Sequence, residues 1–368
     1  MAEAPRYQDI VTWATEQIAA GVFRPRDRFL SEAELGRRFS CSRQTVRRAL
    51  EVLERRGAVT RVQGSGTFIA SARPNAVRRS AGGGDQSRAI GLVSTFMDNY
   101  IFPSIIRGLE RVFAPGGYVV QLASTNNLVS GETRALQLML ERRLDGLIVE
   151  PTRSALPCAN IDLFQTFARR GTPLVFIDSF YPELPIPYVA LDDVQAGYVA
   201  TRYLLGMGHE SIAGIFPHSN RQGHLRYLGY TQALAEHGLS VQDEYVCWHS
   251  KENMQQVLHS AQLLESLSLC TAVLCYNDLT AMTIIDFLRE NGRFVPDDLS
   301  VVGIDDSVLA RFGALTSIAH PAEQLGEAAG KLLLSMMNGA EGRNILFPPK
   351  LVVRGSVKRC EVRHGTAQ

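Results

Sequence analysis

The sequence predicts an α/β protein with two doubly wound lobes, preceded by a small helical head. The 368 residues are too many for one core of ordinary size. From residue 89 onward, short apolar strands alternate with helical stretches, which is typical of parallel sheets covered by helices. Residues 1–88 hold 16 Arg, no Lys and 9 acidic residues, a net charge of +7, against 22 basic and 28 acidic residues (−6) afterwards. The head therefore favours a polyanionic partner, and the rest does not.

The head is expected to contain three helices and a hairpin. Apolar residues recur at helical spacing over 10–18, which predicts the first helix. Ser31 followed by Glu34 has the spacing of a capping box and predicts the start of the second helix. Ser42 caps the third, whose apolar residues share one face. Two short strands within 58–69 then flank a glycine-rich turn.

Residues 71–88 have the Arg, Ala, Ser and Gly composition of a flexible linker. The predicted domains are therefore a head at 1–70, the linker at 71–88, and a two-lobed domain at 89–368, which we call the effector domain. Strands are expected at 89–94, 118–124, 146–149, 173–178, 211–216, 271–275 and 300–305. Helices are expected at 104–113, 132–142, 193–205, 226–237, 278–291 and 321–338.

The third helix of the head carries a basic face opposite its apolar stripe. Arg43, Gln44 and Arg47 lie on that face or at its flanks. Arg can donate two hydrogen bonds to guanine, and Gln can reach base edges or phosphate. A basic helix alone is more often a solvated surface. The ordered combination of a capped helix, a tight turn, a basic helix and a glycine hairpin favours duplex DNA instead.

The segments 21–35, 41–50 and 64–68 resemble the winged helix-turn-helix of GntR-type regulators. The resemblance implies that the third helix reads the major groove, that the start of the second lies near phosphates, and that the hairpin is the wing. Ala33 and Leu30 depart from the residues usual in that family. The residues expected at DNA are Ser31, Glu32, Arg43, Gln44, Thr45, Arg47, Gln63, Gly64 and Gly66.

The effector domain carries polar and aromatic residues just after its predicted strands. In an open α/β sheet, ligands bind beyond the carboxyl ends of the strands. Carboxylates, Arg, Asn and an aromatic ring suit a polyhydroxylated ligand, whose hydroxyls donate and accept while its C–H face stacks. The candidates by position are Asn99, Tyr100, Phe102, Glu150, Arg153, Asp178, His224, Arg226, Asn277 and Asp305.

The same region resembles the sugar-sensing core of LacI-type regulators, which is similar to periplasmic sugar-binding proteins. The matching segments include 90–93, 145–149, 175–178, 206–209, 275–278 and 300–306. The resemblance implies a two-lobed periplasmic-binding-protein-like fold and adds His320. The stretches 100–108, 124–127, 146–152 and 274–278 are similar to repressors that join both halves and respond to L-arabinose. The expected ligand residues are Tyr100, Phe102, Glu150, Arg153, Arg226, Asn277, Asp305 and His320.

Each ligand candidate also has a structural interpretation. The alternatives are helix capping for Asn277 and Asp278, an ion pair with Glu236 or a neighbour for Arg226, and packing for Tyr100, Phe102 and His320.

The sequence therefore predicts a ligand-responsive transcription repressor. No GK[ST] phosphate loop, HExxH or GxSxG motif indicates an enzyme, and we expect no cofactor or metal. A transport protein would carry an export signal in place of 1–88. Without such a signal or an apolar span, we expect a cytoplasmic protein that does not enter membranes. We expect a homodimer on a symmetric operator. Another pentose or sugar derivative as effector, and activation instead of repression, stay open.

Overall fold

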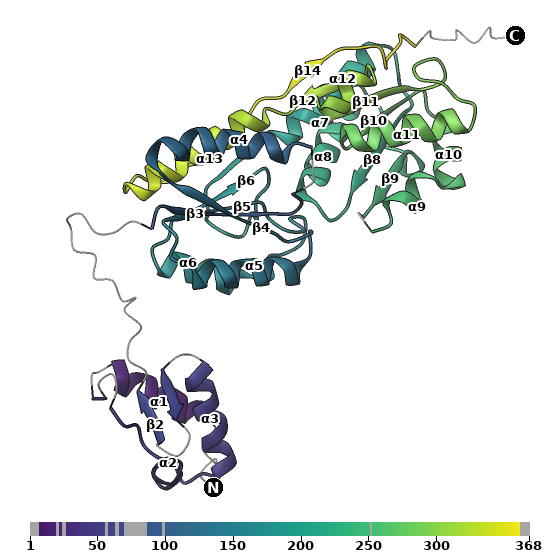
Figure 1. Cartoon of the computed structure of the whole chain (residues 1–368). Coiled ribbons are helices and arrows are strands. Elements are labelled where there is room, and N and C mark those ends of the chain that lie inside the picture. Colours follow the sequence, from purple (N-terminus) through teal and green to yellow (C-terminus); the bar gives the residue numbers. More distant parts are fainter. Residues whose placement is uncertain are drawn as a thin grey trace, which may run out of the picture. The chain divides into compact units, whose positions relative to one another are not determined.

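The computed structural model describes most of the chain, in two compact units, Met1–Asp85 and Gln86–Gln368 (Figure 1). Of the expected linker, only residues 87 and 88 lie within the described part. The described residues are 7–19, 22–23, 27–55, 58–62, 66–69, 87–97, 100–250 and 252–360. Within them, no helix combines the length and the apolar character that crossing a membrane requires.

The first unit contains three helices and a two-stranded antiparallel sheet. Its core is built from apolar side chains of all three helices and the hairpin, among them Ile10, Leu35, Val46 and Leu53. The elements are α1 (Tyr7–Ala19), α2 (Glu32–Phe39), α3 (Arg43–Arg55), β1 (Val59–Val62) and β2 (Gly66–Ile69). This is the architecture expected for the head.

The capping box expected at α2 is present. The Glu34 backbone N–H donates to the Ser31 hydroxyl at 3.3 Å, and the Ser31 backbone N–H donates to the Glu34 carboxylate at 2.7 Å. The Ser42 hydroxyl likewise accepts from the Thr45 backbone N–H at 3.3 Å at the start of α3. These contacts satisfy backbone donors that a helix leaves unpaired in its first turn, and they fix where the two helices begin.

The second unit begins with a lobe built on a parallel six-stranded sheet, in the order β13-β7-β6-β5-β3-β4. Helices lie on both of its faces (Figure 1). Its elements are β3 (Ala89–Ser94), α4 (Phe102–Phe113), a 3-10 turn η1 (Ala114–Gly116), β4 (Val119–Ser124), α5 (Val129–Glu141), β5 (Gly146–Val149), α6 (Ile161–Arg169), β6 (Leu174–Ile177), β7 (Tyr188–Leu191), α13 (Ala322–Met337) and β13 (Ile345–Phe347).

The second lobe has the sheet order β14-β12-β11-β10-β8-β9, parallel except for β14. The elements are α7 (Asp193–Gly206), β8 (Ile212–Pro217), α8 (Arg221–Glu236), η2 (Asp243–Tyr245), β9 (Val246–His249), α9 (Met254–Leu258), α10 (Ala261–Ser268), β10 (Ala272–Cys275), α11 (Asp278–Glu290), β11 (Ser300–Asp305), α12 (Val308–Phe312), β12 (Thr316–Ala319) and β14 (Lys350–Val352). The chain passes between the lobes three times, after β7, β12 and β13. The fold class predicted from the sequence is confirmed.

Two differences from the expected elements affect the site. Helix α8 begins at Arg221, five residues before the expected start at 226. Its first turn is polar and lacks the apolar spacing from which a helix is recognised, so the sequence placed the start too late. Strands β7, β9, β12, β13 and β14, of three or four residues each, were not expected from the sequence. Strand β9 matters most, because it ends at His249 beside the pocket described below.

Close packing of α7 against α8 positions the pocket side of α8. A Cβ atom at Gly229 would lie 1.9 Å from the Val194 carbonyl oxygen, and one at Gly197 would lie 2.0 Å from the Arg226 carbonyl oxygen. No larger residue fits either position without separating the helices. The two glycines thus hold the backbone of α8 close to α7 at the turn that carries Arg226.

Candidate functional site

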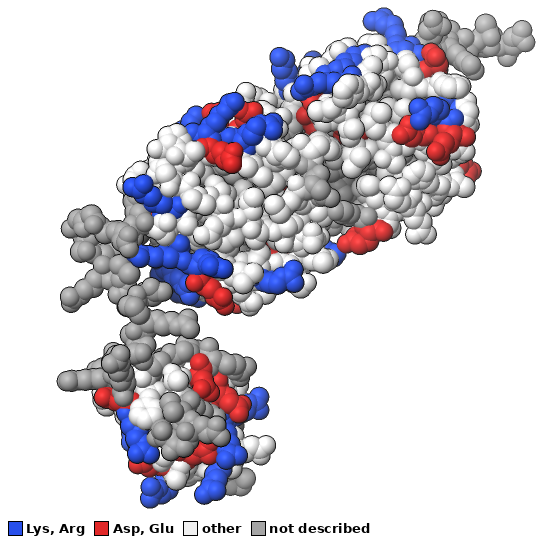
Figure 2. All heavy atoms as spheres, viewed as in Figure 1, with Lys and Arg blue, Asp and Glu red and all other residues white. Residues whose placement is uncertain are grey.

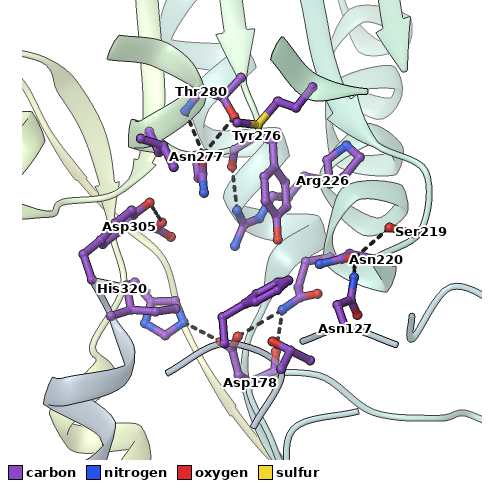
Figure 3. A pocket seen from close by; sticks show the side chains of 18 of the residues that line it. Asn127, Asp178, Ser219, Asn220, Arg226, Tyr276, Asn277, Thr280, Asp305 and His320 are labelled. Atoms are coloured by element: carbon purple, nitrogen blue, oxygen red, sulfur yellow. Dashed lines mark hydrogen bonds and ion pairs between the residues drawn. The ribbon is translucent and has the colours of Figure 1, made fainter. Parts of the chain in front are cut away.

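A cavity of about 320 Å³ lies between the two lobes of the second unit, at the carboxyl ends of both sheets. The first lobe contributes residues that follow β3, β5 and β6, and the second contributes residues that follow β8, β9, β10 and β11. Figure 3 shows their side chains converging on the cavity. The expected residues among its lining are Tyr100, Glu150, Asp178, Arg226, Asn277, Asp305 and His320.

Glu150 follows β5 and is held by the end of β3. Its carboxylate accepts hydrogen bonds from the Ser94 hydroxyl at 2.7 Å, the Thr95 backbone N–H at 2.7 Å and the Thr95 hydroxyl at 2.6 Å. Burial and the charge of Asp178 raise the pKa of Glu150 to about 7. The carboxyl is thus fixed in position and can bind a ligand hydroxyl in either protonation state.

His320 and Asp178 form a buried pair. Nε2 of His320 lies 2.8 Å from Oδ1 of Asp178, and the Gln222 amide donates to the other carboxylate oxygen at 3.1 Å. Burial alone would lower the pKa of His320, but the hydrogen bond and charge of Asp178 outweigh it, and the pKa is raised. Burial would raise the pKa of Asp178, but His320 and Arg226 together lower it. Both groups therefore favour their charged forms.

Arg226 is nearly inaccessible to solvent and is paired with Asp193, Nε to Oδ1 at 2.7 Å. It also donates to the Tyr276 carbonyl at 2.6 Å and lies 4.6 Å over the Tyr276 ring. Burial would lower the pKa of Arg226, but Asp193 raises it instead. Burial raises the pKa of Asp193 to about 6 despite the charge of Arg226. The ion pair expected as an alternative for Arg226 exists, with Asp193 as partner.

The two lobes meet inside the cavity through Tyr100 and Asp305. The Tyr100 hydroxyl donates a short hydrogen bond to the Asp305 carboxylate. Burial, reinforced by the charge of Asp278, raises the pKa of Asp305 to about 7 against the opposing effects of Arg226 and His320. The pKa of Tyr100 is also raised, by burial and by Asp305. A ligand that binds both groups would therefore contact both lobes at once.

Asn277 has both of the roles weighed for it. Its amide oxygen caps α11, accepting from the Thr280 backbone N–H and hydroxyl at 2.9 Å each, while the residue also lines the cavity. Asp278 is buried and does not cap α11. It accepts from the Ser307 backbone N–H at 2.7 Å and the Ser317 hydroxyl at 2.6 Å. These bonds connect α11 to the loop after β11 and to β12.

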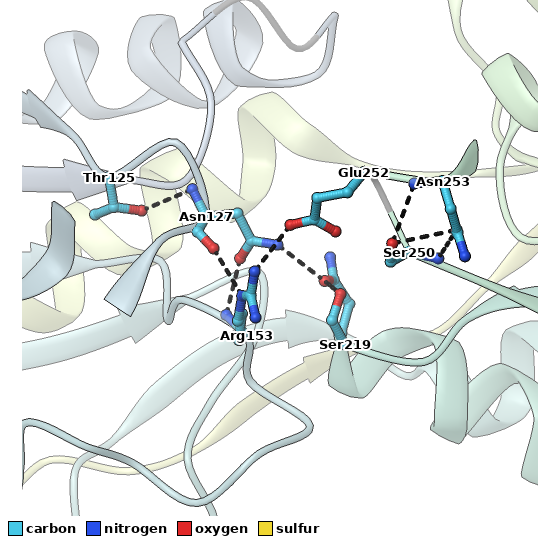
Figure 4. Close-up of polar contacts among 8 residues, drawn as sticks. Thr125, Asn127, Arg153, Ser219, Ser250, Glu252 and Asn253 are labelled. Atoms are coloured by element: carbon cyan, nitrogen blue, oxygen red, sulfur yellow. Dashed lines mark hydrogen bonds and ion pairs between the residues drawn. The ribbon is translucent and has the colours of Figure 1, made fainter. Parts of the chain in front are cut away.

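Three strand-end candidates in the described part of the chain lie elsewhere. Phe102 is 2% exposed and packs in the core of the first lobe, so its structural interpretation as a packing residue is the correct one. Arg153 does not line the cavity and pairs with Glu252 across the lobes at 2.8 Å (Figure 4). His224 is at the surface, with Nε2 2.8 Å from the His218 carbonyl oxygen. Asn99 lies outside the described residues.

Sequence reasoning missed His249, which lines the cavity at the end of β9. Nδ1 of His249 lies 3.3 Å from the Ser250 carbonyl oxygen, so this nitrogen carries the proton, and burial lowers the pKa of the ring. Nε2 is buried with no hydrogen-bond partner among the described residues, and Nδ1 of His320 is in the same situation. His249 thus presents an acceptor, and protonated His320 a donor, to a ligand.

Taken together, the cavity suits a neutral ligand rich in hydroxyl groups. It offers donors from Arg226 and His320, acceptors from Glu150, Asp305 and His249, and the apolar faces of aromatic residues. The buried carboxylates would repel an anion, whereas hydroxyls both donate and accept and can match this set. Gln222, Asn127, Tyr276 and Phe96 are further lining residues that were not singled out from the sequence, although Phe96 and Tyr276 closely follow the expected strands β3 and β10.

The expected DNA-binding face lies on α3 and the start of α2. Arg43, Gln44 and Arg47 are exposed, and Nε of Arg47 lies 3.1 Å from the Glu32 carboxylate. The Thr45 hydroxyl lies 3.0 Å from that of Ser42, and the Ser31 hydroxyl is used in the cap of α2. Gly66 begins β2 with a φ of 115°, which favours glycine. Gln63 and Gly64 lie outside the described residues.

Comparison with known proteins identifies both units. Residues 6–69 match the family of bacterial regulatory proteins called the gntR family, and residues 201–357 match the periplasmic binding protein-like domain. An arabinose metabolism transcriptional repressor of Halalkalibacterium halodurans is 37% identical over 99% of each chain. Another, from Geobacillus stearothermophilus, is 34% identical over 96% of this chain and 98% of its own.

Solved structures agree on the fold. A LacI transcriptional regulator from a Rhodococcus species covers 74% of this chain and 98% of its own, with 27% identity and a TM-score of 0.64. The complex of the transcriptional regulator CelR with cellobiose covers 96% and 99%, with 22% identity and a TM-score of 0.66. Both curated relatives are transcriptional repressors, which confirms the prediction from the sequence that this chain is a transcription regulator and not an enzyme. The chain belongs to the family of bacterial transcriptional repressors that join a gntR-type DNA-binding head to a LacI-type effector domain.

Proposed function

We propose that this repressor binds an operator through its head and is released from it by a small neutral sugar, L-arabinose, thereby controlling sugar-utilisation genes. The observation that carries the proposal is the cavity between the lobes, whose buried donors and acceptors match hydroxyl groups. Two relatives that span nearly the whole chain are named arabinose metabolism transcriptional repressors, which supports arabinose over other sugars.

The proposed ligand contacts come from both lobes. Tyr100 and Glu150 belong to the first, and Arg226, Asn277 and Asp305 to the second, with His320 on the crossover after β12. The proposed DNA contacts are those expected from the sequence, Ser31, Glu32, Arg43, Gln44, Thr45, Arg47, Gln63, Gly64 and Gly66. A repressor acting on DNA works in the cytoplasm, which is where we place it.

A homodimer is part of the proposal. A symmetric operator requires two heads, and two copies of the chain supply them. Val119 and Leu122 are 65% and 43% exposed on β4, the edge strand of the first lobe. Burial of these residues against a second copy would remove apolar surface from water at an unpaired sheet edge. Analytical ultracentrifugation of the full chain should give twice the 40.5 kDa chain mass.

A second candidate effector has one observation in its favour. The similar CelR structure is described as a cellobiose complex, so this fold can also hold a larger sugar. The test is isothermal titration of the full chain with L-arabinose, other pentoses, glucose and cellobiose. Saturable heat with L-arabinose, together with displacement of DNA by the same sugar, supports the proposal. Binding of cellobiose alone would replace arabinose as the effector, and binding of none would remove the effector claim.

The DNA half has its own test. Arg47→Ala should reduce capture of a promoter fragment by at least tenfold, because Arg47 is exposed on the face of α3 proposed to enter the major groove. The affinity for L-arabinose should stay unchanged, since the cavity lies in the other unit. An equal loss of sugar affinity would contradict separate sites.

A further inference from the structure

Five exposed arginines gather at the end of the effector unit opposite the cavity. They precede the amino ends of β3, β5 and β6, whose carboxyl ends border the cavity, and Figure 2 shows Lys and Arg side chains grouped in this part of the first lobe. We call this set the basic rim, and its members are Arg88, Arg142, Arg143, Arg169 and Arg170.

Hydrogen bonds place the members of the rim side by side. Arg170 donates to the Leu140 carbonyl at 2.5 Å, which brings the end of α6 against the end of α5, just before Arg142. The Asp145 carboxylate accepts from the Ser87 backbone N–H at 3.3 Å and the Arg88 backbone N–H at 2.8 Å. The segment from α5 to β5 is therefore in contact with both the end of α6 and the start of β3, and the arginines form one surface.

The rim stands out against the charge of its surroundings. Residues 89–368 hold 22 basic and 28 acidic residues and are net negative. The acidic residues interleaved with the rim are Glu141 and Asp145, and Asp145 already binds two backbone N–H groups. Five positive charges with two negative ones leave a local excess of positive charge. Such a surface attracts polyanions.

One structural role accounts for part of the rim. Arg142, Arg143, Arg169 and Arg170 lie at or just after the ends of α5 and α6, where cations offset the negative end of a helix dipole. Arg169 donates to the Thr166 hydroxyl at 2.6 Å, and Arg170 to a helix carbonyl, so both act locally. One cation is enough to offset the dipole at a helix end, so the dipole does not account for two arginines at the end of each helix. It also does not account for Arg88, which precedes a strand.

The rim also begins where the chain arrives from the head. Only 18 Cα–Cα steps separate Ile69 at the end of β2 from Ser87. At 3.3–3.6 Å per residue, these steps limit the distance between Ile69 and Ser87 to about 65 Å. Because the rim and the head are on one chain, DNA held by the head is present near the rim at a higher effective concentration than free DNA, which favours weak ionic contacts.

We propose that the basic rim binds backbone phosphates of the duplex flanking the operator, which makes the effector unit a second, sequence-independent DNA-binding surface. The proposal rests on the proposed function, because the head must first hold the DNA. Each phosphate neutralised by the rim releases condensed counterions and adds about 0.9 to the slope of log affinity against log salt concentration. The rim thus adds affinity and salt dependence and carries no base preference.

The experiment uses the full chain and a DNA probe obtained with it. A duplex is selected from a random-sequence library by repeated capture on the wild-type protein, and is prepared both with long flanks and trimmed to the minimum bound length. Affinities are measured between about 50 and 200 mM salt for the wild type, for Arg142→Gln/Arg143→Gln and for the control pair Arg202→Gln/Arg289→Gln. The control removes the same charge from exposed helical positions in the other lobe.

We expect the rim pair to lower the salt slope on the flanked duplex by roughly 1 to 2 and to weaken low-salt binding several-fold. The control pair and the trimmed duplex should show no change in slope. Sugar affinity and the unfolding midpoint report whether the fold is intact. An unchanged slope with the rim pair, or the same change with the control pair, would overturn the proposal. Failure to select any duplex with the wild type would instead refute DNA binding itself.

Discussion

Burial raises the pKa of several carboxyl groups in and around the pocket above the values that these groups have in water. Burial raises the pKa of Asp305 to about 7, so the folded chain binds a proton there that the unfolded chain releases near the ordinary value of 3.8. The stabilisation that this proton provides is full below about pH 4 and is lost as pH rises through 7. The same sign applies to Glu150, whose pKa is about 7, and to Asp193, whose pKa is about 6.

Asp305→Asn should therefore stabilise the sugar-free protein at pH 8, by at most about 4 kcal/mol, and the gain should shrink toward pH 4. The amide oxygen can still accept the hydrogen bond from Tyr100. Urea unfolding of the variant and the wild type across this pH range measures the difference. A variant less stable than the wild type at pH 8 would show that Asp305 is not held in an unfavourable charged state.

Arg226 and Asp193 should behave as a buried pair. Arg226→Met leaves the Asp193 carboxylate without its partner, and we expect a loss of about 3–5 kcal/mol in unfolding free energy. The double variant Asp193→Asn/Arg226→Met should recover most of that loss, because no unpaired charge stays buried. Both variants should lose sugar affinity. Equal stabilities of the single and double variants would contradict this account of the pair.

His249 tests the ligand side of the pocket. His249→Ala removes the acceptor at Nε2 and should weaken sugar binding by about 1–2 kcal/mol, or roughly tenfold in Kd. His249→Gln can place its amide oxygen near the same point and should retain most of the affinity. Titration calorimetry of both variants makes the comparison, with DNA affinity in the absence of sugar as the control. Equal loss in both would mean that His249 only packs.

The sequence identified several pocket residues at the ends of recognisable strands, such as Glu150 and Asp305. It missed His249 because the short apolar run of β9 was not recognised as a strand, and His249 is its polar last residue. It assigned Phe102 to the ligand because the start of α4 was expected two residues later, at 104. Whether a side chain at the start of a helix faces the cavity or the core depends on its position around the helix axis. The number of residues between it and the preceding strand does not determine that position.

At the scale of helices, α7 and α8 depend on their glycines. Gly229→Ala would place a methyl group 1.9 Å from the Val194 carbonyl oxygen, so the helices must separate. We expect a loss of roughly 1–3 kcal/mol in unfolding free energy, together with weaker sugar binding because Arg226 moves. Gly206→Ala is the matched control in α7, since a Cβ there meets nothing within 4 Å. Thermal unfolding that ranks the two variants equally would contradict the packing argument.

The longer elements could be predicted because each carries a strong local signal. The six-residue strands β3 and β11 are buried throughout and apolar in their central residues, and they were placed at their observed bounds. The short strands were missed for a physical reason. Strands such as β13 and β14 are fixed by pairing with a distant neighbour, residues 189–191 and 317–319 respectively, and not by their own three residues.

For the whole molecule, the relation between the lobes is the feature on which regulation depends. Beside Tyr100 and Asp305, the lobes are connected at the mouth of the cavity by Asn127 with Asn220 at 3.4 Å and by the exposed pair of Arg153 with Glu252 (Figure 4). An exposed ion pair contributes about 1 kcal/mol or less. The lobes are also joined by the Gln222 amide, which donates to the Asp178 carboxylate at 3.1 Å, and by the Arg221 backbone N–H, which donates to the Ser154 hydroxyl at 3.0 Å. A sugar that binds both lobes can shift their arrangement.

The central claim is that sugar and operator compete through this arrangement. Linkage requires that the factor by which sugar weakens DNA binding equal the factor by which DNA weakens sugar binding. The most direct measurement is the Kd of the full chain for its selected duplex, with and without saturating L-arabinose, beside the Kd for L-arabinose with and without that duplex. We predict the same reduction in both directions, on the order of 5- to 150-fold. A duplex affinity that saturating L-arabinose leaves unchanged would contradict the account.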